Sequence, residues 1–419
     1  MYESSMYFSN GWQYSVTTLA GMSGGLIEPR RGNAHTTYGP FWLHEIGTGD
    51  TPEATANYNI WSSAYNMVYL ANTIIEGVQQ SSGLNEADKL QYIGQALCIR
   101  AFVYYYLTNL YGDVPLVLTT NYAVNATEAR SENEEVWQQI IADLLLAEKD
   151  LDQQEDTPVV DRTQVNKWVV KALLARVYLF REQWQLAADY STELIEHTED
   201  YELLDDLDAV FLANSREAIW QISPEGRGSA STYTYEGNIF IMHPLVPTYT
   251  QIVLAKPFVT AFNVQDRRYQ HWIGYNENIE QYYIFKYKVM TGNTRPIPEY
   301  SMVMRLAEQY LIRAEARIHL QQLPEAMADL GALRTRANET DLLQSMPNPS
   351  VKQLTDTLYS EQKKELFAEW GHYWFDVKRT GRAQEVFGSQ PSWTTTAVWF
   401  PIPAQERSKN PNLTQNDGY

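Results

Sequence analysis

Cysteine is almost absent from this sequence, because Cys98 is the only one among 419 residues. One thiol cannot form an internal disulfide or a cysteine-rich metal site. It falls in an apolar helical pattern, so we expect it to be packed in the core. The seven histidines are scattered, and none forms an HExxH pair. Gly21, Gly24 and Gly25 are not followed by the Gly-Lys-Ser/Thr of a phosphate loop. We therefore predict no metal site, no cofactor and no catalytic residues.

Positive charge is also scarce. Lys and Arg number 32 against 51 Asp and Glu, which gives a formal net charge of −19. Nucleic-acid binding needs clustered cations that displace counterions from the phosphates, so this composition argues against a nucleic-acid partner. It does not exclude a neutral ligand such as a sugar.

Features of membrane insertion and export are missing as well. No run of eighteen apolar residues exists, so no segment predicts a membrane-spanning helix. The first residues, MYESS, carry neither the parts of a signal peptide nor a cysteine for a lipid anchor. Two interpretations follow: the protein is cytosolic, or the sequence begins after an export segment.

What the sequence has in abundance is aromatic residues and helical periodicity. Aromatics make up 13 %, with 29 Tyr, 12 Trp and 13 Phe. Apolar residues recur every three or four positions in 61–75, 137–145, 170–178 and 303–318. This spacing places them on one face of a helix and predicts amphipathic helices in all four segments.

Several helix boundaries have local signals. Asn85 stands three residues before Asp88, and Ser131-Glu-Asn-Glu134 has the pattern of a capping box, so both positions predict helix starts. Pro324 suits the first turn of a helix. The run Tyr111-Gly-Asp-Val-Pro115 predicts the end of a long helix, since glycine accepts positive φ and proline blocks further helix.

A weak internal repeat accompanies the helices. The pattern Ala-Leu-x-x-Arg occurs at 96–100 and again at 172–176, with Phe102 and Tyr178 at matching places. The offset of 76 residues is about two units of the ~34-residue tetratricopeptide repeat. Such hairpins bury their apolar faces only against neighbours. We predict a mostly α protein in which about four tetratricopeptide-like hairpins form a right-handed scaffold and carry an irregular, loop-rich subdomain with short strands.

Two segments do not follow the helical pattern. Residues 223–300 hold 14 aromatics in 78 positions, and 282–289 alternate enough for a short strand. We predict four regions: an aromatic-rich N-terminal segment (1–58), a helical scaffold (59–222), a ligand-binding insertion (223–300), and a helical continuation with the C-terminal region (301–419). A long irregular insertion in a helical chain is more often functional than idle.

Loop aromatics are the candidate binding residues. Sugar rings present apolar C–H faces on which flat side chains stack, while amides and carboxylates bind the hydroxyl groups. Aromatics within helices, such as Tyr65, Tyr104 and Tyr178, are expected in the core. The candidates are the loop aromatics Trp12, Tyr38, Trp42, Tyr249, Trp272 and Tyr275.

Carboxylates offer a competing interpretation. Glu361, Glu365 and Glu369 recur at i, i+4 and i+8, so they share a helix face. Paired carboxylates serve glycoside hydrolysis, and an α-helical glycosidase using Asp50, Glu53 or Glu369 is one rival hypothesis. We favour ion pairing, because Lys363, Lys364, Lys378 and Arg379 are close in sequence. A peptide-binding tetratricopeptide adaptor is a further rival.

Four stretches together resemble the SusD/RagB family of nutrient-binding outer-membrane lipoproteins. They are RAFVYYYLTNLYGDVPLV at 100–117, NKWVVKALLARVY at 166–178, ELFAEWGHYWFDVKRTG at 365–381, and FPIP at 400–403 followed by NPNLTQNDGY at 410–419. The resemblance covers roughly residues 58 to 419. Each motif is modest alone, but their order and spacing are specific.

The resemblance implies function as well as fold. A SusD-like protein is an outward-facing lipoprotein of the outer membrane, so the resemblance implies a signal and lipidated cysteine upstream of this sequence. It implies non-catalytic binding of an oligosaccharide or polysaccharide and delivery to a SusC-like TonB-dependent transporter. The ligand platform is expected on the irregular segments. A RagB-like protein that takes up peptides is the alternative within the family.

Overall fold

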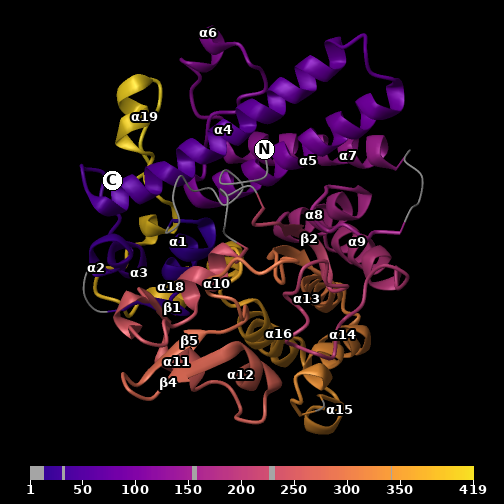
Figure 1. The fold of residues 1–419 in the computed structure, drawn as a ribbon, viewed down its shortest axis with the longest axis vertical. Coiled ribbons are helices and arrows are strands. Elements are labelled where there is room, and N and C mark those ends of the chain that lie inside the picture. Colours follow the sequence, from indigo (N-terminus) through magenta and orange to yellow (C-terminus); the bar gives the residue numbers. More distant parts are fainter. Residues whose placement is uncertain (1–13, 31–33, 153–157, 226–231, 341) are drawn as a thin grey trace.

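The computed structural model describes residues 14–30, 34–152, 158–225, 232–340 and 342–419. This part of the chain is mostly α-helical, as predicted, and its strands form three two-stranded antiparallel sheets (Figure 1). Trp12 lies outside it.

The long helices are α4 (Pro52–Gln80), α5 (Glu86–Tyr111), α7 (Asn133–Leu151), α8 (Lys167–Phe180), α9 (Trp184–Glu196), α13 (Leu306–His319), α14 (Leu323–Arg336) and α16 (Val351–Leu366). The elements between α9 and α13 are β2 (Ala218–Ile222), α10 (Tyr235–Phe240), η2 (Pro247–Tyr249), β3 (Ile252–Leu254), α11 (Lys256–Val259), α12 (Arg267–Trp272), β4 (Ile273–Asn276), β5 (Gln281–Ile284) and β6 (Ser301–Arg305). The remaining short elements are α1 (Val16–Ser23), β1 (Ile27–Pro29), α2 (Ala34–Thr37), α3 (Gly39–Leu43), α6 (Tyr122–Asn125), α15 (Leu342–Ser345), α17 (His372–Arg379), α18 (Ala383–Phe387), η3 (Thr395–Val398) and α19 (Ala404–Lys409).

The long helices form a continuous scaffold. Neighbours pack in the order α4, α5, α7, α8, α9, α13 and α14, and α16 closes against α13 and α14. In Figure 1, α4, α5 and α7 lie along the top and the later helices descend on the right. Each helix buries its apolar face against the next, which is the packing expected of tetratricopeptide-like hairpins. The predicted fold class is confirmed.

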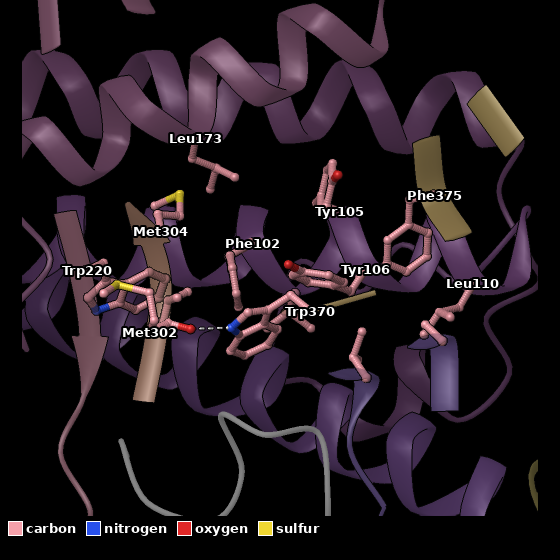
Figure 2. Packing of buried hydrophobic residues seen from close by; sticks show 14 of the residues in the cluster. Phe102, Tyr105, Tyr106, Leu110, Leu173, Trp220, Met302, Met304, Trp370 and Phe375 are labelled. Carbon is pink, nitrogen blue, oxygen red and sulfur yellow. Dashed lines mark hydrogen bonds between the residues drawn. The ribbon is translucent and has the colours of Figure 1, made fainter. Parts of the chain in front are cut away.

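Helix α5 lies at the centre of the core. Its second half is buried on all sides from Ala96 to Tyr111 and is mostly apolar, as expected of a helix surrounded by protein. Cys98 is buried there, as predicted. Figure 2 shows Phe102 between Trp220 and Trp370. Both contacts are edge-on, with ring centroids 5.0 Å and 5.4 Å apart. The Trp370 indole donates to the carbonyl of Met302 at 2.7 Å. The core thereby joins α5 to β2, β6 and the C-terminal region.

The repeated Arg of the Ala-Leu-x-x-Arg pattern has the same role in both copies. Arg100 on α5 makes a two-pronged contact with Asp143 on α7, with both distances at 2.7 Å. Arg176 on α8 contacts Glu308 on α13 in the same way, at 2.6 and 2.7 Å. Both pairs are buried. The planar guanidinium matches the carboxylate fork, so each arginine ties one helix to a neighbour.

Three predicted boundaries hold and others shift. Asn85 caps α5 by accepting from the Asp88 amide at 2.8 Å, Gly112 ends α5 at φ 75°, and Pro324 lies in the first turn of α14. The predicted capping box at Ser131 is wrong, since α7 is preceded by Glu132 without a side-chain cap. The strand expected at 282–289 covers Gln281–Ile284 only.

Paired strands connect the irregular regions to the scaffold. Strands β2 and β6 pair with each other and directly flank residues 223–300, so the insertion leaves and re-enters at adjacent points. Strand β1 pairs with β3, which attaches the N-terminal segment to the insertion. Helix α4 begins at Pro52, within the last residues of the predicted N-terminal segment (1–58). Among the described helices, none is both long and apolar enough to span a bilayer.

Candidate functional site

The structure separates the predicted binding residues into exposed and buried groups. Tyr249 is 72 % exposed and Tyr275 is 47 % exposed, so both rings are open to a ligand. Trp42 on α3 is half-buried and packs against the core. Tyr38 and Trp272 are fully buried, so their assignment to a binding surface is wrong.

The loop that carries Tyr249 is held by its own hydrogen bonds. The His243 ring nitrogen Nδ1 accepts from the backbone amides of Leu245 and Val246 at 3.2 and 2.9 Å. The His243 amide donates to the hydroxyl of Thr250 at 3.0 Å. The Tyr249 ring lies 5.7 Å from the His243 ring, nearly edge-on. These contacts fix the loop beside β1 and β3 and leave the Tyr249 ring facing solvent.

A second aromatic surface lies on the β4–β5 hairpin. Tyr275 and Tyr282 are directly opposite each other in the register, with ring centroids 4.6 Å apart. Tyr269 on the adjacent helix α12 is a neighbour of Tyr282. Burial raises the pKa of the Tyr269 hydroxyl, and Tyr282 adds to this increase. Cross-strand aromatic pairs stabilise hairpins and hold each ring in place. The tyrosines therefore form a pre-organised surface on the insertion.

Gly274 makes this hairpin possible. A Cβ at this position would lie 2.1 Å from the Tyr283 ring, so a larger residue cannot be accommodated without moving that ring. Tyr283 is the cross-strand partner of Gly274, and its ring covers the glycine backbone. Tyr275 and Tyr282 point to the opposite face, because successive side chains of a strand alternate.

Trp272 is buried because it joins the insertion to the scaffold. Its indole nitrogen donates to the carbonyl of Leu207 at 3.0 Å. The Phe211 ring packs edge-on at 5.7 Å, and the Lys286 ammonium lies 4.7 Å from the Trp272 ring centre. A buried tryptophan with a satisfied N–H contributes packing and cation–π energy, not ligand contact.

The carboxylates on the α16 face belong to a buried ion cluster. We use this name for five carboxylates and five cations in mutual contact, Glu217, Asp266, Glu361, Glu365, Glu369, Arg268, Lys286, Arg305, Arg334 and Arg336. Ion pairing is confirmed, but the predicted partners are wrong. Glu365 pairs with Arg336, with Arg305 at 2.6 Å and with Arg268 at 3.3 Å. Glu369 pairs with Lys286 at 2.5 Å and with Arg305 at 2.8 Å. The cations come from α12, α14, β6 and the segment after β5, so the cluster joins insertion and scaffold.

The electrostatics of the cluster oppose a catalytic role for these carboxylates. Burial alone would raise the pKa of Glu369, but Arg305 and Lys286 outweigh it and lower the pKa to about 2. Burial is likewise outweighed at Glu365 by Arg336, Arg305 and Arg268, which lower its pKa. A glycosidase acid needs a raised pKa and access to substrate. These two glutamates have the opposite properties.

Two kinds of site residue escaped the sequence reasoning. Tyr282 was not singled out, although its register opposite Tyr275 makes the aromatic pair. Tyr69 on α4 and Tyr122 on α6 border a pocket of about 310 Å³. Periodicity assigns Tyr69 to a helix but does not show which neighbouring segments leave its ring uncovered. Within the described ranges, no group of three or more His, Cys, Asp or Glu is arranged to hold a metal ion.

Comparison with known proteins adds independent information. Residues 31–179 match a SusD-like family model described as starch-binding and associating with the outer membrane, and residues 264–419 match the SusD family model. A SusD-like protein of Formosa agariphila is 25 % identical, over 89 % of this chain and 82 % of its own length.

Solved structures share the fold over nearly the whole chain. A SusD superfamily protein of Parabacteroides distasonis superposes with a TM-score of 0.84 at 22 % identity, covering 100 % of this chain and 97 % of its own. A protein titled as a laminarin-binding SusD-like protein superposes with a TM-score of 0.75 at 20 % identity, covering 96 % and 94 %.

Proposed function

The chain belongs to the SusD/RagB family, and on that premise we propose that it binds an oligosaccharide or polysaccharide without chemically changing it. The observation that carries this proposal is the Tyr275–Tyr282 pair on the β4–β5 hairpin, in which the exposed Tyr275 ring lies 4.6 Å from the half-buried Tyr282 ring. Such rings stack on the apolar faces of sugars without requiring one sugar identity. Tyr249 supplies a second exposed ring on the same insertion.

The relatives support a glycan as the ligand class. One matching family model is described as starch-binding, and one structural neighbour is titled as laminarin-binding. We assign the ligand surface to residues 223–300 and keep the four predicted regions as a working division, with α4 added to the scaffold. Trp42 and Trp12 remain proposed contacts from the N-terminal segment.

The protein associates with the outer membrane, in keeping with the family description. We propose that it is an outward-facing lipoprotein and that it passes the bound glycan to a SusC-like TonB-dependent transporter. In this arrangement the helical scaffold docks on the transporter and the insertion faces the ligand. Because the buried glutamates are paired with arginines, binding without turnover is the expected behaviour.

The test is calorimetric titration with laminarin, soluble starch and a mixed peptide digest. Tyr275→Ala should weaken binding of the preferred glycan by about tenfold, since a central aromatic contact contributes on this scale. Tyr92→Ala is the matched control, because Tyr92 on α5 is 44 % exposed and lies outside the insertion. Chromatography of the incubated glycan should show no products.

Two results would overturn the proposal. Binding of peptides in place of glycans would move the protein to the RagB-like alternative. New reducing ends in the incubated glycan would establish an enzyme, and a Glu369→Gln variant would then show whether that carboxylate is involved.

A further inference from the structure

A pocket lies in the upper part of the molecule, away from the β4–β5 hairpin of the insertion (Figure 1). Its volume is about 310 Å³, at the lower end of the range of roughly 300–1,000 Å³ for small-ligand sites. Helix α4 forms one wall, the segment through α6 forms the second, and α19 with the following residues forms the third. In Figure 1 these elements meet at the top of the molecule. Among the described residues of 223–300, none lines it.

The second wall is built on a buried network. Arg100, which is paired with Asp143, donates to the Asn72 side chain at 2.8 Å. Asn72 in turn donates to the carbonyl of Val117 at 3.0 Å. The Val117 amide donates to the Tyr104 hydroxyl at 2.7 Å. Val117, which lines the pocket, is therefore held from both sides, so this wall is in place without a ligand.

The other walls are tied together by hydrogen bonds between distant segments. Glu76 on α4 accepts from the Thr120 amide at 2.9 Å, which holds the segment leading into α6. Asn410 donates to the Glu128 carbonyl at 2.7 Å, and Asn412 donates to the Thr127 carbonyl at 2.7 Å. Pre-organisation of this kind reduces the entropy lost when a ligand binds.

The pocket presents aromatic rings from two sides. Trp61 and Tyr65 form its inner part, with ring centroids 4.9 Å apart. Tyr69, 49 % exposed, and Tyr122, 82 % exposed, stand at its border. Exposed aromatic residues that cluster around a pocket indicate a binding site more often than scattered ones do. Rings on two sides suit a flat ligand with apolar faces.

The charges in the pocket limit the class of ligand. Glu128, Glu406 and Lys409 contribute two negative charges and one positive charge, and Lys409 pairs with Glu406 at 2.8 Å. Burial raises the pKa of the Tyr65 hydroxyl, and Tyr104, Tyr111 and Glu406 add smaller increases. The net negative charge disfavours an acidic sugar. Carboxylates nevertheless accept hydrogen bonds from sugar hydroxyls.

We propose that this pocket is a second carbohydrate site, which binds an uncharged sugar ring independently of the insertion. This inference rests on the proposed function, because it gives a second site to the same class of ligand. A glycan held at two places on the protein dissociates more slowly than one held at a single place, since the second contact forms at a high effective concentration. Short oligosaccharides should bind the two sites separately.

The experiment titrates the full chain with laminaritriose, maltotriose and a trimer of galacturonic acid. For the neutral trisaccharide that binds, the stoichiometry should fall from two to one in Tyr69→Ala/Tyr122→Ala, and the affinity of the pocket site should fall about tenfold in Glu128→Gln. Tyr92→Ala should leave both sites intact, and Tyr275→Ala should leave the pocket site. The acidic trimer should not bind the pocket.

The outcomes distinguish this inference from the proposed function. If Tyr275→Ala abolishes glycan binding and the pocket variants leave it unchanged, the second site alone is overturned. If the pocket variants bind sugar normally but no longer co-purify with the transporter, the pocket is a contact for a protein partner. This result also overturns the second carbohydrate site. The absence of binding of any glycan to the unmodified chain overturns both proposals.

Discussion

Replacing Arg305 by methionine is the sharpest test of how the insertion is held to the scaffold. Its guanidinium contacts Glu217 at 2.9 Å, Glu365 at 2.6 Å and Glu369 at 2.8 Å, and all four residues are buried. Methionine keeps much of the side-chain volume but removes a positive charge that balances the negative charges of these buried carboxylates. Breaking a buried pair in this way costs about 3–5 kcal/mol.

The structure allows a second route to this magnitude. The pKa of Glu369 is lowered from its ordinary 4.5 to about 2, with burial opposing and Arg305 and Lys286 favouring the charge. That difference corresponds to roughly 3 kcal/mol in favour of the charged form. Since Arg305 is the larger of the two favourable contributions, most of this energy should be lost with it. The two routes agree.

Equilibrium urea unfolding followed by circular dichroism measures the effect. Arg295→Met is the matched control, because Arg295 contacts Glu225 at 2.6 Å on the exposed surface. An exposed pair is worth about 0–1 kcal/mol, so this variant should unfold near the wild-type midpoint. Equal destabilisation by the two substitutions would refute the reasoning, because burial would then not determine the strength of these ion pairs.

Three further outcomes are expected. Glu369→Gln should flatten the acid dependence of stability, because a carboxylate with a lowered folded-state pKa stabilises the fold above pH 4.5 and loses this contribution as the pH falls toward about 2. Urea midpoints measured between pH 6 and pH 2 test this expectation, and an unchanged pH dependence contradicts it. Trp272→Ala should lower the free energy of unfolding by about 3–5 kcal/mol, while the folded fraction keeps its glycan affinity. Loss of affinity without loss of stability would show that Trp272 contacts the ligand. Gly112→Ala should destabilise the fold by about 1–3 kcal/mol, because alanine is strained at φ 75°. The added Cβ makes only an ordinary contact with Trp399 at 3.4 Å, so the backbone strain is the cause. Wild-type stability in thermal melts would show that the helix end can rearrange.

Local features of the fold were accessible from the sequence. Asn85 marks the start of α5 and Gly112 marks its end. Both ends are visible in the sequence, because a side-chain cap and a positive φ depend on residues within one turn of the helix. The internal repeat places Arg100 and Arg176 at equivalent positions, and both make the same two-pronged contact. The family motifs in these same helices were equally visible.

Long-range pairings were not accessible in this way. Glu365 pairs with Arg336, Arg305 and Arg268, which lie 29, 60 and 97 positions away, whereas the nearby lysines were the expected partners. Proximity along a helix cannot reveal which cations another segment brings to its buried face. The aromatic pair of the hairpin was missed for a similar reason, since the partner of Tyr275 depends on the register of β4 and β5.

Trp272 and Tyr275 show where the information in the sequence ends. They are three residues apart in the same aromatic insertion, yet one is buried against Phe211 and the other is exposed. The sequence by itself determined the amphipathic helices, both ends of α5, the repeat and the family, because these depend on spacing over a few residues or on motifs in order. Only the tertiary structure decided which aromatics face a ligand, since burial depends on which distant segment covers each ring.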